Sequence, residues 1–318
     1  MHCQNQIHIK KTDYLLRICV ICTLFGCASD KSITITWPEH FNIQIPFQSD
    51  SKGIIISTFW GVNKKEYKLY LDNHSPSWVN DAVLKNNPSV LRSNNLLYKT
   101  TTADGKNIHG DVYMCDKINI GELSFKNVAF YNISNEANTG KIDGVIGENI
   151  MNLGIWKIDF SNNMITFASS MDSIQGLQDT EPVPATFTDK AIEIEVTLSK
   201  SIKKKFGLDI GYNGCMIIPA NEFVPLTASG KQVFKMTKKV STPAGADTIE
   251  NSVIIDSMWI GNYYWGGLSG ECIATNTIVK EKLIGMGFFK QFAFLVIDYR
   301  NKAVYLSRLR RIEIPVLE

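Results

Sequence analysis

The chain has 318 residues and a formal net charge of +2, with 44% hydrophobic and 20% charged residues. These proportions are ordinary for a globular protein. The length suffices for one large domain or for two medium ones, each with its own core. The near balance of charge argues against a dedicated nucleic-acid binder, which would carry a clustered basic excess. We therefore expect no nucleic-acid partner.

The N-terminal segment 1–26 differs from the rest of the chain. A basic front with Lys10, Lys11 and Arg17 precedes a short apolar run at 18–25. This order is typical of a secretory signal, and the run is too short to span a bilayer as a helix. Residues 1–26 are therefore predicted to be a signal segment, and residues 27–50 to be a tether with leading strands.

The end of the signal segment, Leu24-Phe25-Gly26-Cys27, resembles the lipobox of bacterial lipoproteins. The resemblance implies that Cys27 receives lipid. It also implies an exported protein, anchored at the bacterial cell envelope on the periplasmic side or at the outer-membrane surface. The alternative is a plain signal peptide in which Cys27 is incidental.

From about residue 53 the pattern is typical of short β-strands. A β-branched and aromatic run at 53–60 and an alternating run at 67–71 flank a turn at 61–66. Asp104-Gly105 predicts a hairpin within 96–115. Helical periodicity is confined to four short segments, 77–86, 148–153, 199–206 and 276–283. Many short strands with few helices predict an all-β architecture.

The chain contains an internal repeat. Asp72 and Asp209 each follow a Leu at the end of a predicted strand. An apolar-apolar-Gly element ends at Gly147 and again at Gly285, and an Ile-Asp-aromatic element includes Asp159 and again Asp298. The interval between the two copies is nearly the same for all three landmarks. This agreement predicts two similar lobes, residues 51–170 and 185–318, joined by a linker at 171–184.

Each predicted lobe thus has a strand that ends at an Asp, a hairpin, and a returning apolar-apolar-Gly element. This outline resembles the aspartic peptidases, both the two-lobed pepsin type and the single-lobe retroviral type. The resemblance implies a duplicated, two-lobed acid-protease β-barrel fold with an interlobe cleft. It further implies that Asp72 and Asp209 form the catalytic pair, and that Gly147 and Gly285 lie in ψ-shaped crossings behind the catalytic loops, where a Cβ would obstruct the close approach.

The resemblance also implies a mechanism. Two carboxyl groups held close together do not both ionise easily, so they share a proton and titrate as a pair. The charged carboxylate takes a proton from water, which attacks the peptide carbonyl, and the neutral carboxyl donates a proton toward the carbonyl oxygen. The expected ligand is an extended peptide or protein substrate in the interlobe cleft. No cofactor is expected.

The residues after the two aspartates depart from the Asp-Thr/Ser-Gly pattern of the family. In the first repeat Asn73, His74 and Ser75 follow the Asp. Asn73 can donate and accept a hydrogen bond, as the family's Thr does toward the opposite loop. His74 places an imidazole where the family has no side chain. Ser75 matches a position whose hydroxyl, in the family, bonds the outer oxygen of the Asp.

The second repeat continues with Ile210, Gly211 and Tyr212. The side chain of Ile210 forms no hydrogen bond, whereas Gly211 keeps the family's glycine. Two hypotheses remain open. The protein is an aspartic endopeptidase, or it is a catalytically impaired relative that binds peptides or an envelope partner. A third and weaker hypothesis assigns the lobes a scaffold role only.

The hairpin after Asp72 corresponds to the flap that closes over substrate in the family, as lids do elsewhere. The best match is residues 98–111, and a second hairpin is expected around 234–256. The predicted tip of the flap is formed by Ala103, Asp104, Gly105 and Lys106.

Several other residues have structural interpretations. Asp143, Asp159 and Asp298 are predicted to be turn residues. The aromatic cluster of Trp259, Tyr263, Tyr264 and Trp265 predicts a packed hairpin or, alternatively, one wall of the cleft.

Cysteine usage excludes a disulfide framework. After Cys27 only Cys115, Cys215 and Cys272 remain, which is an odd number. One bridge, such as Cys215–Cys272, would be compatible with an oxidising compartment. The chain beyond the signal has no CxxC pair and no cluster of histidines, so no metal site is expected. We expect the protein to be a monomer.

Overall fold

A computed structural model of the chain describes residues 35–307 with internal gaps. Four predictions lie outside the described residues: the signal segment 1–26, lipid attachment at Cys27, the flap tip at Ala103, Asp104, Gly105 and Lys106, and the Cys215–Cys272 bridge, because Cys272 is not described. The gaps are residues 62, 88–89, 102–106, 133–141, 179, 190, 199–201, 220–235, 242–246, 254–256, 267–272 and 277–280.

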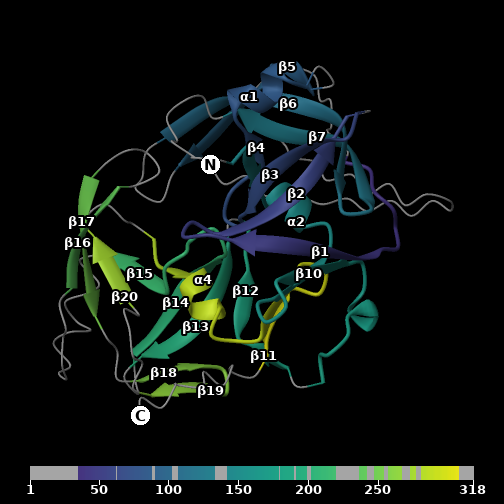
Figure 1. The fold of residues 1–318 in the computed structure, drawn as a ribbon. Coiled ribbons are helices and arrows are strands. Elements are labelled where there is room, and N and C mark those ends of the chain that lie inside the picture. The colour runs from purple at the N-terminus through teal and green to yellow at the C-terminus, as the bar shows by residue number, and fades with distance from the viewer. Residues whose placement is uncertain are drawn as a thin grey trace, which may run out of the picture.

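The predicted all-β architecture is confirmed, and the described strands form two sheets (Figure 1). The first sheet has the order β11-β23-β22-β9-β10-β1-β2-β3-β8-β4-β7-β6-β5. Its strands in chain order are β1 (Asn42–Ser49), β2 (Ile54–Trp60), β3 (Lys65–Leu71), β4 (Trp78–Val79), β5 (Val90–Thr101), β6 (Asn107–Ile120), β7 (Leu123–Asn132), β8 (Gly144–Ile146), β9 (Ile155–Asp159), β10 (Met164–Ala168), β11 (Glu181–Val183), β22 (Phe294–Asp298) and β23 (Ala303–Leu306).

The second sheet has the order β16-β17-β20-β15-β21-β14-β13-β18-β19, with β12 paired to β13. Its strands are β12 (Ala185–Phe187), β13 (Ile192–Leu198), β14 (Ile202–Asp209), β15 (Met216–Pro219), β16 (Met236–Ser241), β17 (Asp247–Val253), β18 (Ser257–Ile260), β19 (Tyr263–Gly266), β20 (Ile273–Asn276) and β21 (Leu283–Gly285). The described helices are α1 (Asp81–Lys85), α2 (Glu148–Met151), α4 (Met286–Phe289) and a 3₁₀ turn, η1 (Met171–Ser173).

Alternation of apolar and polar residues explains why these segments are strands. Side chains of a strand point alternately to opposite faces. In β2, Ile54, Ile56, Thr58 and Trp60 are buried while the residues between them are partly exposed. In β13 the sequence IEIEVTL buries every second residue in the same way. Strands β2 and β13 therefore each turn one face to the core.

Both predicted hairpins are present. Strands β5 and β6 pair antiparallel up to Thr101 and Asn107, and strands β16 and β17 pair antiparallel up to Ser241 and Asp247. The tips between these pairs lie in gaps of the description.

The helix predictions are only partly confirmed. Helix α1 lies within 77–86 and α2 within 148–153. The helix predicted at 199–206 is wrong, because residues from Ile202 onward form β14. The helix predicted at 276–283 is also wrong at its ends, where Asn276 closes β20 and Leu283 opens β21. The described strand residues of these two segments pair with neighbouring strands of the second sheet.

The repeats show the same crossing pattern. Strand β8 lies between β3, to which it is parallel, and β4, to which it is antiparallel. Strand β21 likewise lies between β14, parallel, and β15, antiparallel. The returning segment of each repeat is thus inserted beside the strand that carries the Asp.

The repeats meet in a continuous antiparallel ladder. Strand β9 pairs with β22, its counterpart in the second repeat. Lys157 lies opposite Val296. Lys157 is two positions before Asp159, and Val296 is two positions before Asp298, so the two residues occupy the same position in their repeats. An approximate two-fold relation between the repeats thus passes close to this pair.

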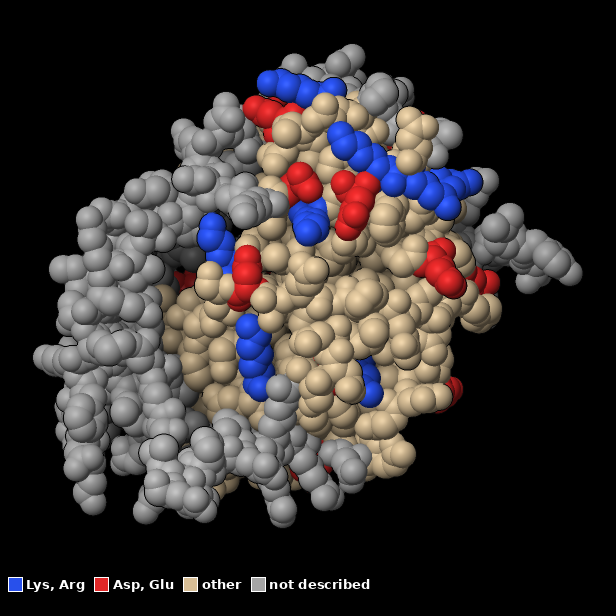
Figure 2. Space-filling model, viewed as in Figure 1, with Lys and Arg blue, Asp and Glu red and all other residues tan. Residues whose placement is uncertain are grey.

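Figure 1 shows β2–β7 in the upper part of the molecule and β13–β20 in the lower and left part, so the repeats occupy separate regions. In Figure 2 acidic and basic side chains are interspersed over the described part of the visible face. Among the described residues, no helix combines the length and the apolar character needed to cross a membrane.

Candidate active site

The two aspartates lie at equivalent positions of the repeats. Asp209 is the last residue of β14, and Asp72 directly follows β3. The backbone N–H of Asp72 donates to the carbonyl of Ile146 in β8, at 3.0 Å. Asp209 lies opposite Gly285 of β21. The parallel pairing of each carrier strand with a returning strand therefore fixes both aspartates from behind.

Each carboxylate accepts hydrogen bonds from its own loop. The N–H of His74 donates to Oδ1 of Asp72 at 2.8 Å. The N–H groups of Gly211 and Tyr212 donate to Oδ1 of Asp209 at 2.8 and 3.0 Å. Backbone donors favour the ionised form of a carboxyl group. Asp209, with two such donors, is the better supported anion.

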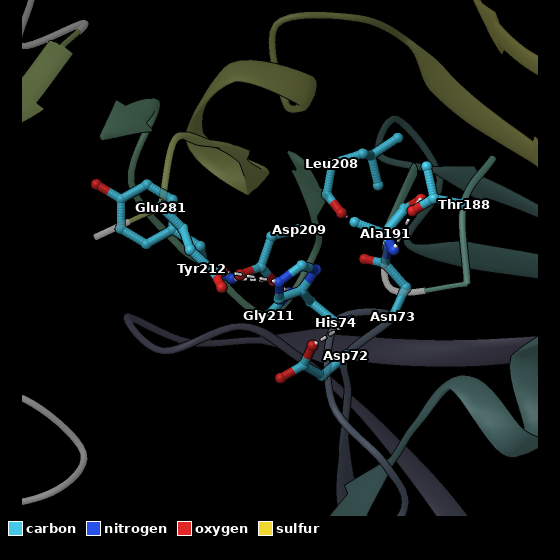
Figure 3. A network of polar contacts seen from close by, with 10 residues as sticks. All are labelled: Asp72, Asn73, His74, Thr188, Ala191, Leu208, Asp209, Gly211, Tyr212 and Glu281. Atoms are coloured by element: carbon cyan, nitrogen blue, oxygen red, sulfur yellow. Dashed lines mark hydrogen bonds and ion pairs between the residues drawn. The ribbon is translucent and has the colours of Figure 1, made fainter. Parts of the chain in front are cut away.

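The two loops are in close contact across the repeats (Figure 3). A Cβ added at Gly211 would lie 2.3 Å from Cγ of Asp72. No side chain fits at that separation, so only glycine allows the carboxyl group of Asp72 to rest against the second loop.

The side chain of Asn73 connects the two repeats. Its Nδ2 donates to the carbonyl of Leu208 at 2.8 Å, and its Oδ1 accepts from the N–H of Ile210, also at 2.8 Å. Asn73 is buried, so both partners lie away from water. One amide thus satisfies a donor and an acceptor on either side of Asp209, whereas the buried side chain of Ile210 forms no reciprocal bond.

Burial raises the pKa values of both aspartates. Burial, followed by the negative charge of Asp209, raises the pKa of Asp72 to about 7. Burial also raises the pKa of Asp209, opposed by the charge of His74 and by the N–H groups of Tyr212 and Gly211. Such a pair retains one proton over a wide pH range.

His74 adds a group that the resemblance does not imply. Its Nε2 lies 3.1 Å from Oε2 of Glu281. Glu281 lies shortly before β21, which begins at Leu283. This hydrogen bond, helped by Asp209 and Asp72 and opposed by burial, raises the pKa of His74 to about 9. Burial raises the pKa of Glu148, the first residue of α2, and the charge of His74 opposes this shift.

The two predicted ψ-crossings have matching geometry. A Cβ at Gly147 would lie 2.2 Å from the carbonyl oxygen of Ser75, and a Cβ at Gly285 would lie 2.2 Å from that of Tyr212. The next residue in each case donates its N–H to the same carbonyl, Glu148 to Ser75 and Met286 to Tyr212. Glycine is required at both positions because two backbones pass in contact.

The role predicted for the hydroxyl of Ser75 is not observed. Its Oγ donates instead to the carbonyl of Pro76 at 3.1 Å. Asp72 therefore has one loop donor, the N–H of His74, among the bonds of the described residues.

The turn predicted at Asp159 and at Asp298 is confirmed, whereas Asp143 bonds the backbone of strand β3 and forms no turn. Asp298 accepts from the N–H groups of Arg300 and Asn301, and Asp159 accepts from those of Ser161 and Asn162. Oδ2 of Asp143 caps the N–H of Lys68 at 2.8 Å. None of these three carboxylates belongs to the site.

The aromatic cluster forms the predicted hairpin. Strands β18 and β19 pair directly, with Trp259 opposite Tyr264 and their ring centroids 4.8 Å apart. Strand β18 also pairs with β13. In the sheet order, β13 separates the hairpin from β14, the strand that carries Asp209. This placement supports the structural interpretation of the cluster.

Glu281 was not identified from the sequence. It occupies the repeat position of Asp143, since Gly285 corresponds to Gly147. Asp143 caps a strand of its own lobe, whereas Glu281 reaches His74 of the other repeat. The only available signal was that an acid recurs at this position of the repeat. Within the described residues, no group of three or more His, Cys, Asp or Glu residues is arranged to hold a metal ion.

Comparisons with known proteins bear on the fold. No protein-family model matches the chain, and no curated protein matches it in sequence. Among solved structures, the chain is similar to an aspartic proteinase from Irpex lacteus, with a TM-score of 0.60 and 15% sequence identity. The match covers 85% of this chain and 98% of that one. The two proteins share the all-β, two-lobed acid-protease fold, and this distance of relationship carries no statement about activity.

Proposed function

We propose that the protein is an aspartic endopeptidase that hydrolyses peptide bonds with a water molecule activated between Asp72 and Asp209. The observation that carries the proposal is the amide of Asn73, which bonds the backbone on both sides of Asp209 and so ties the two carboxyl-bearing loops together. Their raised pKa values give the pair a shared proton, which this chemistry needs.

The hydrogen-bond pattern supports an assignment of roles. Asp209 accepts two loop N–H groups and its charge is favoured by His74, so the pair carries its negative charge mainly there. Asp72 has one loop donor and the pKa of about 7, so it holds the proton below that pH. Asp209 is therefore the general base and Asp72 the general acid.

The reaction proceeds in two balanced steps. Asp209 accepts a proton from water while the water oxygen bonds the peptide carbonyl carbon, and Asp72 donates its proton to the carbonyl oxygen. The resulting diol collapses as its C–N bond breaks. The nitrogen takes the proton held by Asp209, Asp72 recovers its proton from a hydroxyl of the diol, and a carboxylic acid and an amine leave.

Purified protein would be incubated with denatured protein and with a mixed peptide library across acidic to neutral pH, and new termini would be identified by mass spectrometry. Asp72→Asn and Asp209→Asn should each abolish cleavage. Asp159→Asn, in the turn after β9, is the matched control and should retain it. Cleavage that survives both site substitutions would exclude this mechanism.

A second candidate is a peptide-binding protein without turnover. The position of His74 favours this candidate, because its side chain lies beside the aspartates and the hydrolysis described above does not use it. The same library distinguishes the two functions. Binding measured by calorimetry together with intact peptides after long incubation would support the second candidate, and cleavage would exclude it.

We further propose that the protein works outside the cytoplasm, attached to the bacterial cell envelope through lipid on Cys27. The support is the basic and apolar order of residues 1–26 and the Leu-x-Gly-Cys ending. Membrane fractions of cells that express the full chain should contain the protein, and Cys27→Ser should release it into the soluble extracytoplasmic fraction. An unchanged membrane association of Cys27→Ser would refute lipid attachment at this residue.

A further inference from the structure

We propose that His74, held by Glu281, is a positioning residue that supplies a fixed positive charge to the Asp72–Asp209 pair and keeps one of the two carboxyl groups ionised in mildly acidic solution. The inference rests on the proposed function, because it assigns a control of the same carboxyl pair. It concerns the position at which this chain departs most from the Asp-Thr/Ser-Gly pattern.

The placement of the imidazole is specific. The backbone N–H of His74 is bound to Oδ1 of Asp72, so the residue is part of the carboxylate's own loop. Its ring extends toward the second repeat, where Nε2 meets Glu281 at 3.1 Å (Figure 3). The side chain of His74 is 21% exposed, and Glu281, at 51%, is reached from solvent. The pair therefore spans the two repeats at the rim of the site.

Gly207 of the second repeat lies beside the imidazole ring. A Cβ at Gly207 would lie 3.8 Å from Cε1 of His74 and 3.2 Å from Cδ2 of Leu283. Gly207 precedes Asp209 by two positions, and the equivalent residue of the first repeat is Tyr70. The side chain of His74 thus faces Gly207, a strand position without a side chain, whereas the first repeat has Tyr70 at the equivalent position.

The charges that act on the imidazole all have one sign. They are Asp72 on its own loop, Asp209 on the opposite loop, Glu281 before β21 and Glu148 at the start of α2. Each favours the imidazolium, and the imidazolium in turn favours the ionised form of each. The raised pKa of His74, about 9, is consistent with a ring that is charged wherever the proposed reaction runs.

The orientation of the ring depends on Glu281. The second ring nitrogen of His74, Nδ1, is buried and has no hydrogen-bond partner among the described residues. No second bond therefore locks the imidazole, and Glu281 is the group that holds it. Loss of Glu281 should leave the imidazole in the site, lower its pKa and allow the ring to change its orientation.

The experiment compares the acid limb of the pH profile of kcat/KM in four variants. His74→Ala and the neutral, similarly sized His74→Gln remove the charge, so the limb should move to higher pH by about 1 unit, as expected for a charge at close range. His74→Lys should restore the limb toward its original position. His74→Gln also serves if His74→Ala does not fold.

Glu281→Gln should not move the acid limb to higher pH. His74 stays protonated in acid, while Asp209 loses a negative neighbour that raises its pKa. The acid limb should therefore stay in place or move to lower pH. In the same variant the pKa of His74, measured by nitrogen NMR, should fall from about 9 toward the ordinary value of about 6.5. A merely structural pair would lower kcat in both variants without opposed shifts.

An unchanged limb in His74→Gln, or limbs that move the same way in the His74 and Glu281 variants, would overturn the inference. If the wild-type protein cleaves nothing, the proposed function fails but this test remains. Carbon NMR titration of the Asp72 and Asp209 carboxyl groups then reports the same shifts without turnover, and equal titrations in wild type and His74→Gln would overturn the inference in that case too.

Discussion

Asn73 holds the backbone N–H of Ile210, a residue of the other repeat, through its side-chain oxygen at 2.8 Å. The same amide donates to the carbonyl of Leu208. Position 73 of the first repeat thereby bonds the backbone on both sides of Asp209. The corresponding position of the second repeat, Ile210, is apolar and returns no bond. Among the described residues, the hydrogen bonds that join these two loops are therefore made by the side chain of Asn73.

Replacing Asn73 by Ala should destabilise the protein and lower activity together. The buried N–H of Ile210 and carbonyl of Leu208 would lose their partner, which costs about 1–3 kcal/mol for each unsatisfied group. Loosening the carboxyl pair by about 1 Å should lower kcat/KM on the order of 10²-fold. Chemical denaturation and peptide cleavage measure the two effects.

Asn73→Asp is a companion variant for this prediction. It keeps the acceptor for Ile210, loses the donor for Leu208 and places a third carboxyl group beside the buried pair, so its loss of stability should be larger near neutral pH than in acid. Equal stability of wild type and Asn73→Ala would show that the cross-repeat bonds contribute nothing.

Gly211→Ala should abolish activity. The added Cβ would lie 2.3 Å from Cγ of Asp72, so the loop or the carboxyl group must move. Gly53→Ala is a suitable comparison, because its Cβ would meet the ring of Tyr70 at an ordinary 3.4 Å. Cleavage assays and thermal unfolding of both variants test this contrast, and full activity in Gly211→Ala would contradict the described contact.

The raised pKa of Asp72 predicts how stability varies with pH. The folded protein keeps this proton up to about pH 7, whereas an unfolded Asp loses it near pH 3.9. Folded protein thus binds more protons over this interval, and the contribution of Asp72 to stability, fully present below about pH 3.9, is lost as pH rises through about 7.

Asp72→Asn removes that dependence. The melting temperature of the variant should exceed that of wild type most clearly above pH 7, and the difference should shrink as the pH falls toward 4. Thermal unfolding of both proteins across this range measures it. Two parallel curves would mean that Asp72 titrates normally in the folded protein.

The turn aspartates should affect stability and leave the reaction chemistry intact. Asp298 is fully buried and accepts three hydrogen bonds, from the N–H groups of Arg300 and Asn301 and from Nδ2 of Asn301. Its replacement by Ala should cost about 1–3 kcal/mol or more. Asp159 makes the equivalent bonds at the surface, so Asp159→Ala should cost less. The reverse order in denaturation experiments would contradict the burial difference.

The repeat made most of the fold predictable. The nearly constant interval between equivalent aspartates and glycines located β3, β8 and β9 together with β21, β22 and the end of β14 at Asp209 from the sequence alone. Those positions are constrained by close backbone contact, and the contact demands the same residue type in both halves. Sequence patterns are informative where the physical constraint is this narrow.

The segment at 199–206 illustrates the opposite case. Three consecutive lysines favour a helix by intrinsic propensity. In the fold, residues 202–206 belong to β14, and Lys203 and Lys205 form ion pairs with Glu195 and Glu193 of β13. Pairing with a neighbouring strand outweighed the local preference. The contact between His74 and Glu281 escaped prediction for a related reason, because two positions so far apart in the sequence were brought together by the fold alone.

The contact between Gly211 and Asp72 has a consequence for the origin of the site. Identical subunits of a two-fold dimer must present identical loops. A histidine in place of Gly211, in addition to His74, would place a Cβ 2.3 Å from Cγ of Asp72. The approach of the two loops seen in this structure therefore allows an imidazole on one copy only. Joining two copies in one polypeptide lifts that restriction, since one copy can keep the glycine on which the carboxyl groups approach while the other copy acquires an imidazole.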